Sequence, residues 1–111
     1  MTNSSSIDLS VIESLKELMG DAFEILITTF IDDTGKLVHS LSELQIQNDI
    51  EVFTRNAHSV KSSSANIGAM KLSAIAAELE TQGKTGDITS TIDKIIILEN
   101  EFTQVCSKIK L

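Results

Sequence analysis

The sequence contains no proline, tyrosine or tryptophan, and it has a single cysteine among its 111 residues. The absence of proline, together with glycines that fall mostly where helices would end, predicts helices joined by short turns. Cys106 cannot form an internal disulfide, and its position on the inward stripe of the last expected helix predicts a buried core residue. No β-type alternation is present, so we expect an all-α protein.

Basic and aromatic residues are also few. Nine Lys and Arg stand against 16 Asp and Glu, and the formal net charge of -7 repels nucleic acid and acidic membrane surfaces. The four phenylalanines fall at helical core positions, which leaves no stacking platform for single-stranded nucleic acid. The apolar runs are too short to cross a bilayer, and residues 1–6 lack the features of a secretory signal. We therefore expect a cytoplasmic protein that binds another protein, with no nucleic-acid or membrane partner.

Apolar residues at alternating spacings of four and three mark the helices. Helices are expected over residues 10–19, 21–47 and 50–67, between Gly68 and the cluster at residues 83–87, and over residues 88–109. Their candidate caps are Ser10 in a capping box, Asp21, Asn48 or Asp49, and Asp87.

The four longer helices are expected to form an antiparallel up-down-up-down four-helix bundle, with the short first helix covering one end. Residues 1–7 are expected to be a flexible N-terminal tail, and residues 8–111 a single helical domain. The same apolar spacing is compatible with an intermolecular coiled coil, but the short turns favour packing within one chain. We therefore expect a monomer.

One histidine lies on the wrong face of its helix for a packing role. The inward stripe of that helix consists of Phe53, Ala57, Val60, Ser64 and Ile67. His58 lies roughly 150° from the centre of this stripe, which points its side chain to solvent. Arg55, Ser62 and Ala65 share the outward face, and Lys61 lies one turn along.

This setting suits a nucleophile. A neutral imidazole keeps a lone pair on one ring nitrogen, and small neighbours allow it to reach a phosphoryl group held by another protein. The Lys61 ammonium can stabilise charge on the phosphoryl oxygens during transfer. A surface histidine is more often simply a solvated polar residue, and we interpret His39, which has no comparable setting, in that way.

Residues 57–80 have the sequence AHSVKSSSANIGAMKLSAIAAELE, which resembles the signature of histidine-containing phosphotransfer (HPt) domains. The matching positions are His58, Lys61, Gly68, Leu72, Leu79 and Glu80. Ser62 departs from the pattern, because the family usually has Gly there. Serine is the next small choice, so slower transfer or an altered choice of partner is expected while the nucleophile is unaffected.

The resemblance implies a stand-alone phosphocarrier of bacterial two-component phosphorelays. His58 would accept a phosphoryl group from the phospho-aspartate of a receiver domain and pass it reversibly to another receiver, in a hybrid sensor kinase or a response regulator. The chain shows no glycine-rich phosphate loop and no carboxylate cluster for a metal, so we expect no intrinsic kinase activity and no bound cofactor. By the same resemblance, Mg²⁺ is expected in the acidic pocket of the partner receiver.

The resemblance also implies roles for the neighbours of His58. Glu80 would accept a hydrogen bond from His58 Nδ1–H and leave Nε2 as the attacking atom, although an ordinary solvated glutamate is the alternative. The residues expected to dock the receiver are Arg55, Ser59, Ser62, Ala65, Asn66, Gly68 and Lys84.

Three other classes of protein compete with this interpretation. A helical adaptor that docks receivers without being phosphorylated would tolerate loss of the His58 imidazole. A helix-bundle metalloprotein needs facing carboxylates and Glu-x-x-His motifs, which the sequence lacks. A histidine kinase dimerisation domain also displays a histidine on a helix, but it pairs two chains and is followed by an ATP-binding domain, which is not expected here.

Overall fold

The computed structural model describes residues 7–109, and all regular elements in this range are helices. The elements are α1 (Leu9–Met19), α2 (Ala22–Thr29), the π-helical turn η1 (Phe30–Thr34), α3 (Gly35–Gln47), α4 (Ile50–Asn66), α5 (Met70–Lys84) and α6 (Ile92–Ile109). The prediction of an all-α protein is confirmed for this part of the chain. Residues 1–6 of the predicted tail lie outside the described residues.

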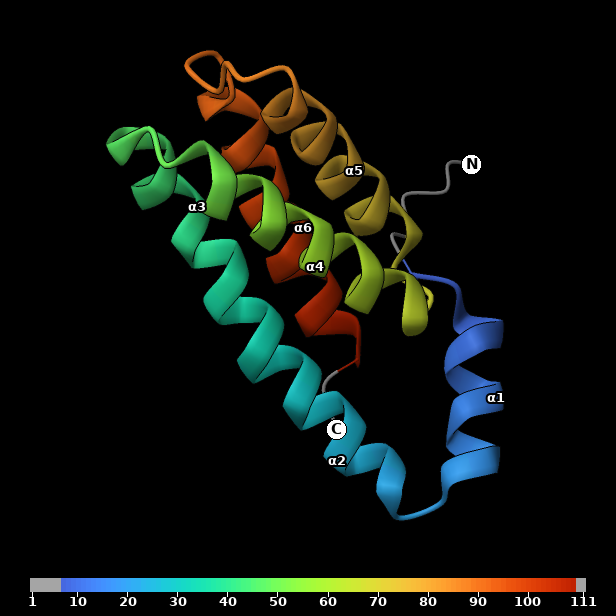
Figure 1. Ribbon diagram of the computed structural model, residues 1–111. Helices are drawn as coiled ribbons and strands as arrows, with labels where there is room; N and C mark the ends of the chain where they lie inside the picture. Colours follow the sequence, from blue (N-terminus) through green and yellow to red (C-terminus); the bar gives the residue numbers. More distant parts are fainter. Residues whose placement is uncertain (1–6, 110–111) are drawn as a thin grey trace.

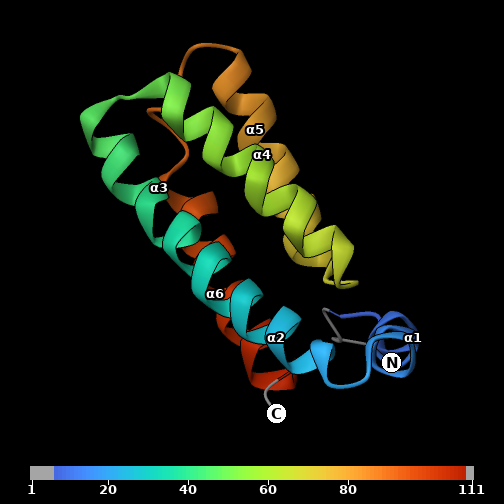
Figure 2. The same cartoon turned by 60° about the horizontal axis from the view of Figure 1, so that its bottom comes forward.

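Helices α3, α4, α5 and α6 enclose the core. Each packs against the next in chain order, and α6 also packs against α3, so that the contacts form a closed ring. Figures 1 and 2 show these helices running alongside one another, with α1 set at the end where α4 passes into α5. Large side chains that are fully buried in this core include Leu41, Phe53, Leu72, Leu79 and Leu98.

The long helix expected over residues 21–47 is a continuous helical run with an irregular centre. Helices α2 and α3 are joined by η1, a five-residue π-helical turn that was not predicted from the sequence. Thr34 in this turn is buried, and its Oγ1 lies 3.0 Å from Ser63 Oγ on α4. The turn therefore connects the long helical run to the helix that carries His58.

The helix starts agree only in part with the predicted caps. Asp8 caps α1 in place of Ser10, because Asp8 Oδ1 accepts a hydrogen bond from the Ser10 backbone N–H at 3.0 Å. Asp21 makes no side-chain capping bond at the start of α2. Asp49 caps α4 as predicted, with its Oδ1 3.3 Å from Val52 N.

The last helix begins later than predicted, at Ile92. Asp87 accepts hydrogen bonds from the backbone N–H and the hydroxyl of Thr89, at 3.0 and 2.7 Å, and so forms a local turn in place of a helix cap. Ile88 is still fully buried in the core, whereas Ile92, at the start of α6, is 39% exposed.

Three further residues have surroundings different from those predicted. Ile7, assigned to the flexible tail, is buried with the core. Cys106, expected to be buried, is half-buried. Gly83, expected in the turn after the fourth predicted helix, is buried within α5, which continues to Lys84.

Candidate functional site

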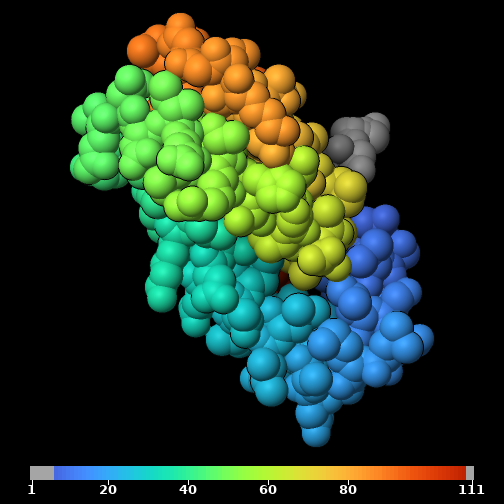
Figure 3. Space-filling model, viewed as in Figure 1, coloured from blue at the N-terminus to red at the C-terminus, as the bar shows by residue number. Residues whose placement is uncertain are grey.

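His58 lies on the outer face of α4, and its side chain is 55% exposed. Its predicted neighbours Arg55, Ser62 and Ala65 are exposed as well. The space-filling view in Figure 3 shows α4 at the surface between α3 and α5. The outward orientation predicted from the apolar period is therefore confirmed, and another molecule can approach the imidazole.

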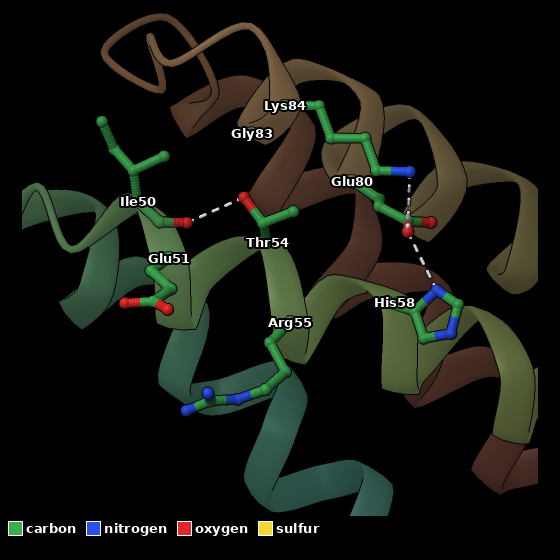
Figure 4. Close-up of a pocket in the computed structure, with 8 residues that line it drawn as sticks. All are labelled: Ile50, Glu51, Thr54, Arg55, His58, Glu80, Gly83 and Lys84. Atoms are coloured by element: carbon green, nitrogen blue, oxygen red, sulfur yellow. Dashed lines mark hydrogen bonds and ion pairs between the residues drawn. The ribbon is translucent and has the colours of Figure 1, made fainter.

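A buried carboxylate on α5 lies behind the imidazole. The Glu80 side chain is only 8% exposed, and its Oε2 lies 2.9 Å from His58 Nδ1, as Figure 4 shows. Its Oε1 lies 2.8 Å from Lys61 Nζ, and Lys84 Nζ lies 3.4 Å from Oε2. Glu80 is therefore not a solvated glutamate, because nitrogen groups of three side chains surround it.

This carboxylate remains ionised at neutral pH. The hydrogen bond from Lys61 is the main cause that holds the pKa of Glu80 at about 2, with the His58 bond and the Lys61 charge adding to it and burial opposing it. An ionised carboxylate only accepts hydrogen bonds, so His58 Nδ1 must carry the proton of this pair. In the neutral ring the lone pair then lies on Nε2, which points away from Glu80 in Figure 4.

Close packing of α4 against α5 holds these groups in place. Ala57 on α4 and Ala76 on α5 are both fully buried, and such small side chains allow helices to approach closely. Ser73 Oγ on α5 donates a hydrogen bond to the Lys61 carbonyl oxygen at 2.9 Å. A side chain of α5 is therefore bonded to the α4 backbone at Lys61, one turn from His58.

A recess of about 510 Å³ lies beside His58. Its lining residues, drawn in Figure 4, are Ile50, Glu51, Thr54, Arg55, His58, Glu80, Gly83 and Lys84. Arg55 and Lys84 bring positive charge to this recess, and Glu51 brings a negative charge. Lys61 lies against the Glu80 carboxylate. Arg55, Lys61 and Lys84 form a basic island around His58 in a chain whose net charge is -7.

The recess includes four residues that were not predicted as part of the site: Ile50, Glu51, Thr54 and Gly83. Gly83 follows Glu80 by three positions, which places both on the same helix face. That spacing was the available signal, but a glycine followed by Lys-Thr-Gly is more typical of a helix end.

Gly68 was expected to dock the receiver, but the structure places it in the interior. Gly68 is buried at the turn between α4 and α5, where its carbonyl oxygen accepts a hydrogen bond from Asp8 N at 2.7 Å. Its φ is +82°, and a Cβ there would lie 2.8 Å from Val11 Cβ. Gly68 therefore seats α1 against the bundle. Ser59 is half-buried, and Asn66 is exposed.

The second histidine lies elsewhere. His39 is on α3, and with Ile31, Phe102 and Cys106 it lines a different recess.

Within residues 7–109, no group of three His, Cys, Asp or Glu side chains is placed to hold a metal ion. Over the same range, no helix combines the length and the apolar character needed to span a bilayer.

Comparison with known proteins identifies the family. The family model of the Hpt domain matches residues 25–108. This chain belongs to the Hpt domain family. Its structure is similar to the crystal structure of histidine-containing phosphotransfer protein B (HptB) from Pseudomonas aeruginosa PAO1. The TM-score is 0.90 and the sequence identity 30%, and the match covers 97% of this chain and 94% of that chain. No curated protein matches the sequence.

The resemblance found in residues 57–80 is thus confirmed at the level of the family. Hpt domains are phosphocarrier modules that interact with receiver domains, so this Hpt protein has a phosphotransfer role in two-component signalling. The consequence of Ser62 in place of the usual glycine stays a prediction.

Proposed function

We propose that His58 accepts a phosphoryl group from the phospho-aspartate of one receiver domain and passes it to an aspartate of another. The observation that carries this proposal is the 2.9 Å contact between Glu80 Oε2 and His58 Nδ1. It leaves Nε2 as a free nucleophile on an exposed helix face. An imidazole held at one nitrogen and open at the other suits attack on a phosphorus atom presented by another protein.

In the accepting step, the Nε2 lone pair forms a bond to phosphorus while the bond between phosphorus and the aspartate oxygen breaks. The aspartate carboxylate leaves with the electron pair of that bond, so no proton has to move. Because Nδ1 keeps its hydrogen, the ring becomes positively charged, and Glu80 stabilises this charge through the existing contact. Donation is the reverse reaction, with the carboxylate of the second receiver as nucleophile.

Lys61 supplies positive charge to the phosphoryl oxygens during both steps. Its Nζ bonds to Glu80 Oε1, and its side chain is 36% exposed, so it can turn toward a group on Nε2. Lys84 lies 3.4 Å from Glu80 Oε2 and keeps the carboxylate paired when Lys61 turns away. The two lysines therefore have different tasks.

The partners are receiver domains of a hybrid sensor kinase or of response regulators, in the cytoplasm. The basic island of Arg55, Lys61 and Lys84 faces their acidic pocket, which holds the Mg²⁺, while this chain supplies no metal ligand and no kinase activity. The docking face also includes Ser59, Ser62, Ala65 and Asn66. The protein acts as a monomeric up-down-up-down bundle, since the ring of helix contacts closes within one chain.

Phosphoryl uptake by variants of the two histidines tests the proposal. A receiver carrying labelled phosphoryl groups is mixed with the wild type, His58→Gln or His39→Gln, and acid-labile, base-stable label on the Hpt protein is measured. We expect the wild type and His39→Gln to take up label and His58→Gln to take up none. Equal uptake by His58→Gln and the wild type would contradict the proposal.

The same experiment separates a carrier from an adaptor. An adaptor binds the receiver with equal affinity in all three forms and takes up label in none of them. Measurement of receiver binding alongside label uptake therefore distinguishes an adaptor from a protein that does not recognise the receiver.

A further inference from the structure

Gly83 lies at a point of very close approach between α5 and α4. A Cβ on this residue would lie 2.1 Å from Thr54 Oγ1, 3.1 Å from Thr54 Cβ and 3.4 Å from Thr54 Cα. Non-bonded carbon and oxygen atoms normally approach to about 3.5 Å, so no side chain fits here unless Thr54 or a helix moves. Gly83 is not among the described glycines with positive φ, so space and not backbone conformation explains this glycine.

A hydrogen bond holds the Thr54 side chain in its present rotamer. Its Oγ1 donates a hydrogen bond to the Ile50 carbonyl oxygen at 2.7 Å, as Figure 4 shows, and a β-branched side chain has few allowed rotamers in a helix. The approaches to Thr54 Cβ and Cα involve atoms that no side-chain rotation moves. A methyl group on residue 83 would therefore push α5 away from α4.

The same interface holds the bond between Glu80 and His58. Thr54 precedes His58 by four residues on α4, and Gly83 follows Glu80 by three on α5, so the two contacts lie about one helical turn apart. Relief of the clash at 2.1 Å requires a displacement of more than about 1 Å. The 2.9 Å hydrogen bond is lost beyond about 3.5 Å, so the required displacement exceeds what this bond tolerates.

We propose that Gly83 is a positioning residue whose contact with Thr54 sets the distance between Glu80 and His58, and thereby the tautomer of the His58 ring. The inference deepens the proposed function, and it rests on that function only for its effect on phosphoryl transfer. The tautomer itself can be measured in protein that has never been phosphorylated.

Imidazole ¹⁵N chemical shifts of His58, recorded near pH 8 on unphosphorylated protein, report the tautomer directly. The wild type is expected to show Nδ1–H with little of the other tautomer. Gly83→Ala is expected to show a mixture of both tautomers and a transfer rate about tenfold lower, as for loss of one hydrogen bond to a charged group. The double variant Thr54→Ala/Gly83→Ala removes Oγ1 and leaves the 3.1 Å approach to Cβ, so most of the wild-type signal and rate should return.

Gly35→Ala is the matched control. Gly35 is also a buried helical glycine, but a Cβ there would meet Phe102 at an ordinary 3.4 Å. This variant should keep the wild-type shifts and rate. A folded Gly83→Ala protein with wild-type shifts overturns the inference, and so does a double variant that recovers nothing. If Gly83→Ala does not fold, the double variant decides: a folded protein with the wild-type tautomer supports the inference, and an unfolded one overturns it.

These outcomes separate the inference from the proposed function. A tautomer shift in Gly83→Ala together with no phosphoryl uptake by any form would overturn the function and leave the positioning role intact. Normal phosphoryl uptake together with an unchanged tautomer in Gly83→Ala would overturn the positioning role and leave the proposed function intact.

Discussion

Two carboxylates are buried to the same degree in the described part of the chain, but their surroundings differ. Taken as whole residues, Glu80 on α5 and Glu101 on α6 are each 6% exposed. Glu80 has nitrogen groups of three side chains within 3.4 Å. Glu101 has Lys71 Nζ at 3.8 Å from Oε1, and its Oε2 has no hydrogen-bond partner.

The difference lies in the convergence of donors, and not in burial alone, at the carboxylate of the candidate site. Burial raises the cost of a charge, and only well-placed donors offset that cost. Around Glu80 they do so, because the bond from Lys61 and the other contacts hold the pKa of Glu80 at about 2. One of these donors is also a ring whose other nitrogen is open to solvent, which connects the buried charge to chemistry at the surface. Glu101 has no such connection.

The largest effect expected from this comparison is on transfer rate. Glu80→Ala removes both the orientation of His58 and the charge that stabilises the phosphorylated ring, so transfer should slow on the order of 10- to 100-fold. Glu101→Ala should leave the rate nearly unchanged, because Glu101 bonds to no group of the site. Rapid-quench measurement of label transfer from a phosphorylated receiver compares the two. Equal slowing would show that burial of a carboxylate, and not its contact with His58, matters for transfer.

The two lysines on Glu80 allow a finer test. Lys61→Ala should slow transfer about tenfold and leave the helical circular dichroism unchanged, because in the proposed mechanism the ammonium acts on the phosphoryl oxygens. Lys84→Ala should slow transfer only about twofold, because Lys84 contacts Glu80 at the longer distance of 3.4 Å and its side chain is 67% exposed. Lys94→Ala, which removes a lysine paired with Glu78 away from the site, is the control. A larger loss for Lys84→Ala than for Lys61→Ala would reverse the assignment of their tasks.

The lowered pKa of Glu80 also predicts how stability depends on pH. The pKa of Glu80 is about 2 in the folded chain and 4.5 in the reference state, so the unfolded chain takes up the proton first as the pH falls. The contribution of Glu80 to stability is then full above about pH 4.5 and is lost as the pH falls toward 2. Because both lysines are partly exposed, we expect a loss of about 1–2 kcal/mol.

Urea denaturation between pH 7 and pH 2 measures this loss. The free energy of unfolding of Glu80→Gln, which cannot titrate at this position, should fall less steeply with acid than that of the wild type. Parallel curves for the two proteins would contradict the ion-pair geometry at Glu80.

Periodicity alone predicted much of what places His58. The four-three spacing of apolar residues predicted the helices. The angle between His58 and the inward stripe from Phe53 to Ile67 predicted that its side chain is exposed. These features depend on the geometry of a single helix, which the local sequence determines. The family signature added Glu80, whose position relative to His58 depends on how two helices pack.

Features that depend on contacts between elements were missed or misplaced. A glycine inside a helix and a glycine that ends one look alike in sequence, so Gly83 was assigned to a turn and its fit against Thr54 was not predicted. Gly68 was assigned to the docking face because it belongs to the signature, whereas α1 covers it. Asp87 was a plausible cap, but its bonds to Thr89 form a separate turn before α6.

The smallest effect concerns the stability that each buried carboxylate provides. Glu101→Met removes a buried carboxylate with one oxygen that has no hydrogen-bond partner. Among the described residues, the only ion pair lost is the 3.8 Å contact with Lys71, whose side chain is 62% exposed. The substitution should therefore raise the free energy of unfolding by about 0.5–1 kcal/mol. Glu80→Met should lower it by about 1 kcal/mol, because it breaks three contacts. Urea denaturation at pH 7 measures both. If both substitutions change the free energy of unfolding in the same direction, burial of the carboxylate matters more for stability than the arrangement of its donors. Changes in opposite directions are expected only if the donors determine whether a buried carboxylate stabilises the fold.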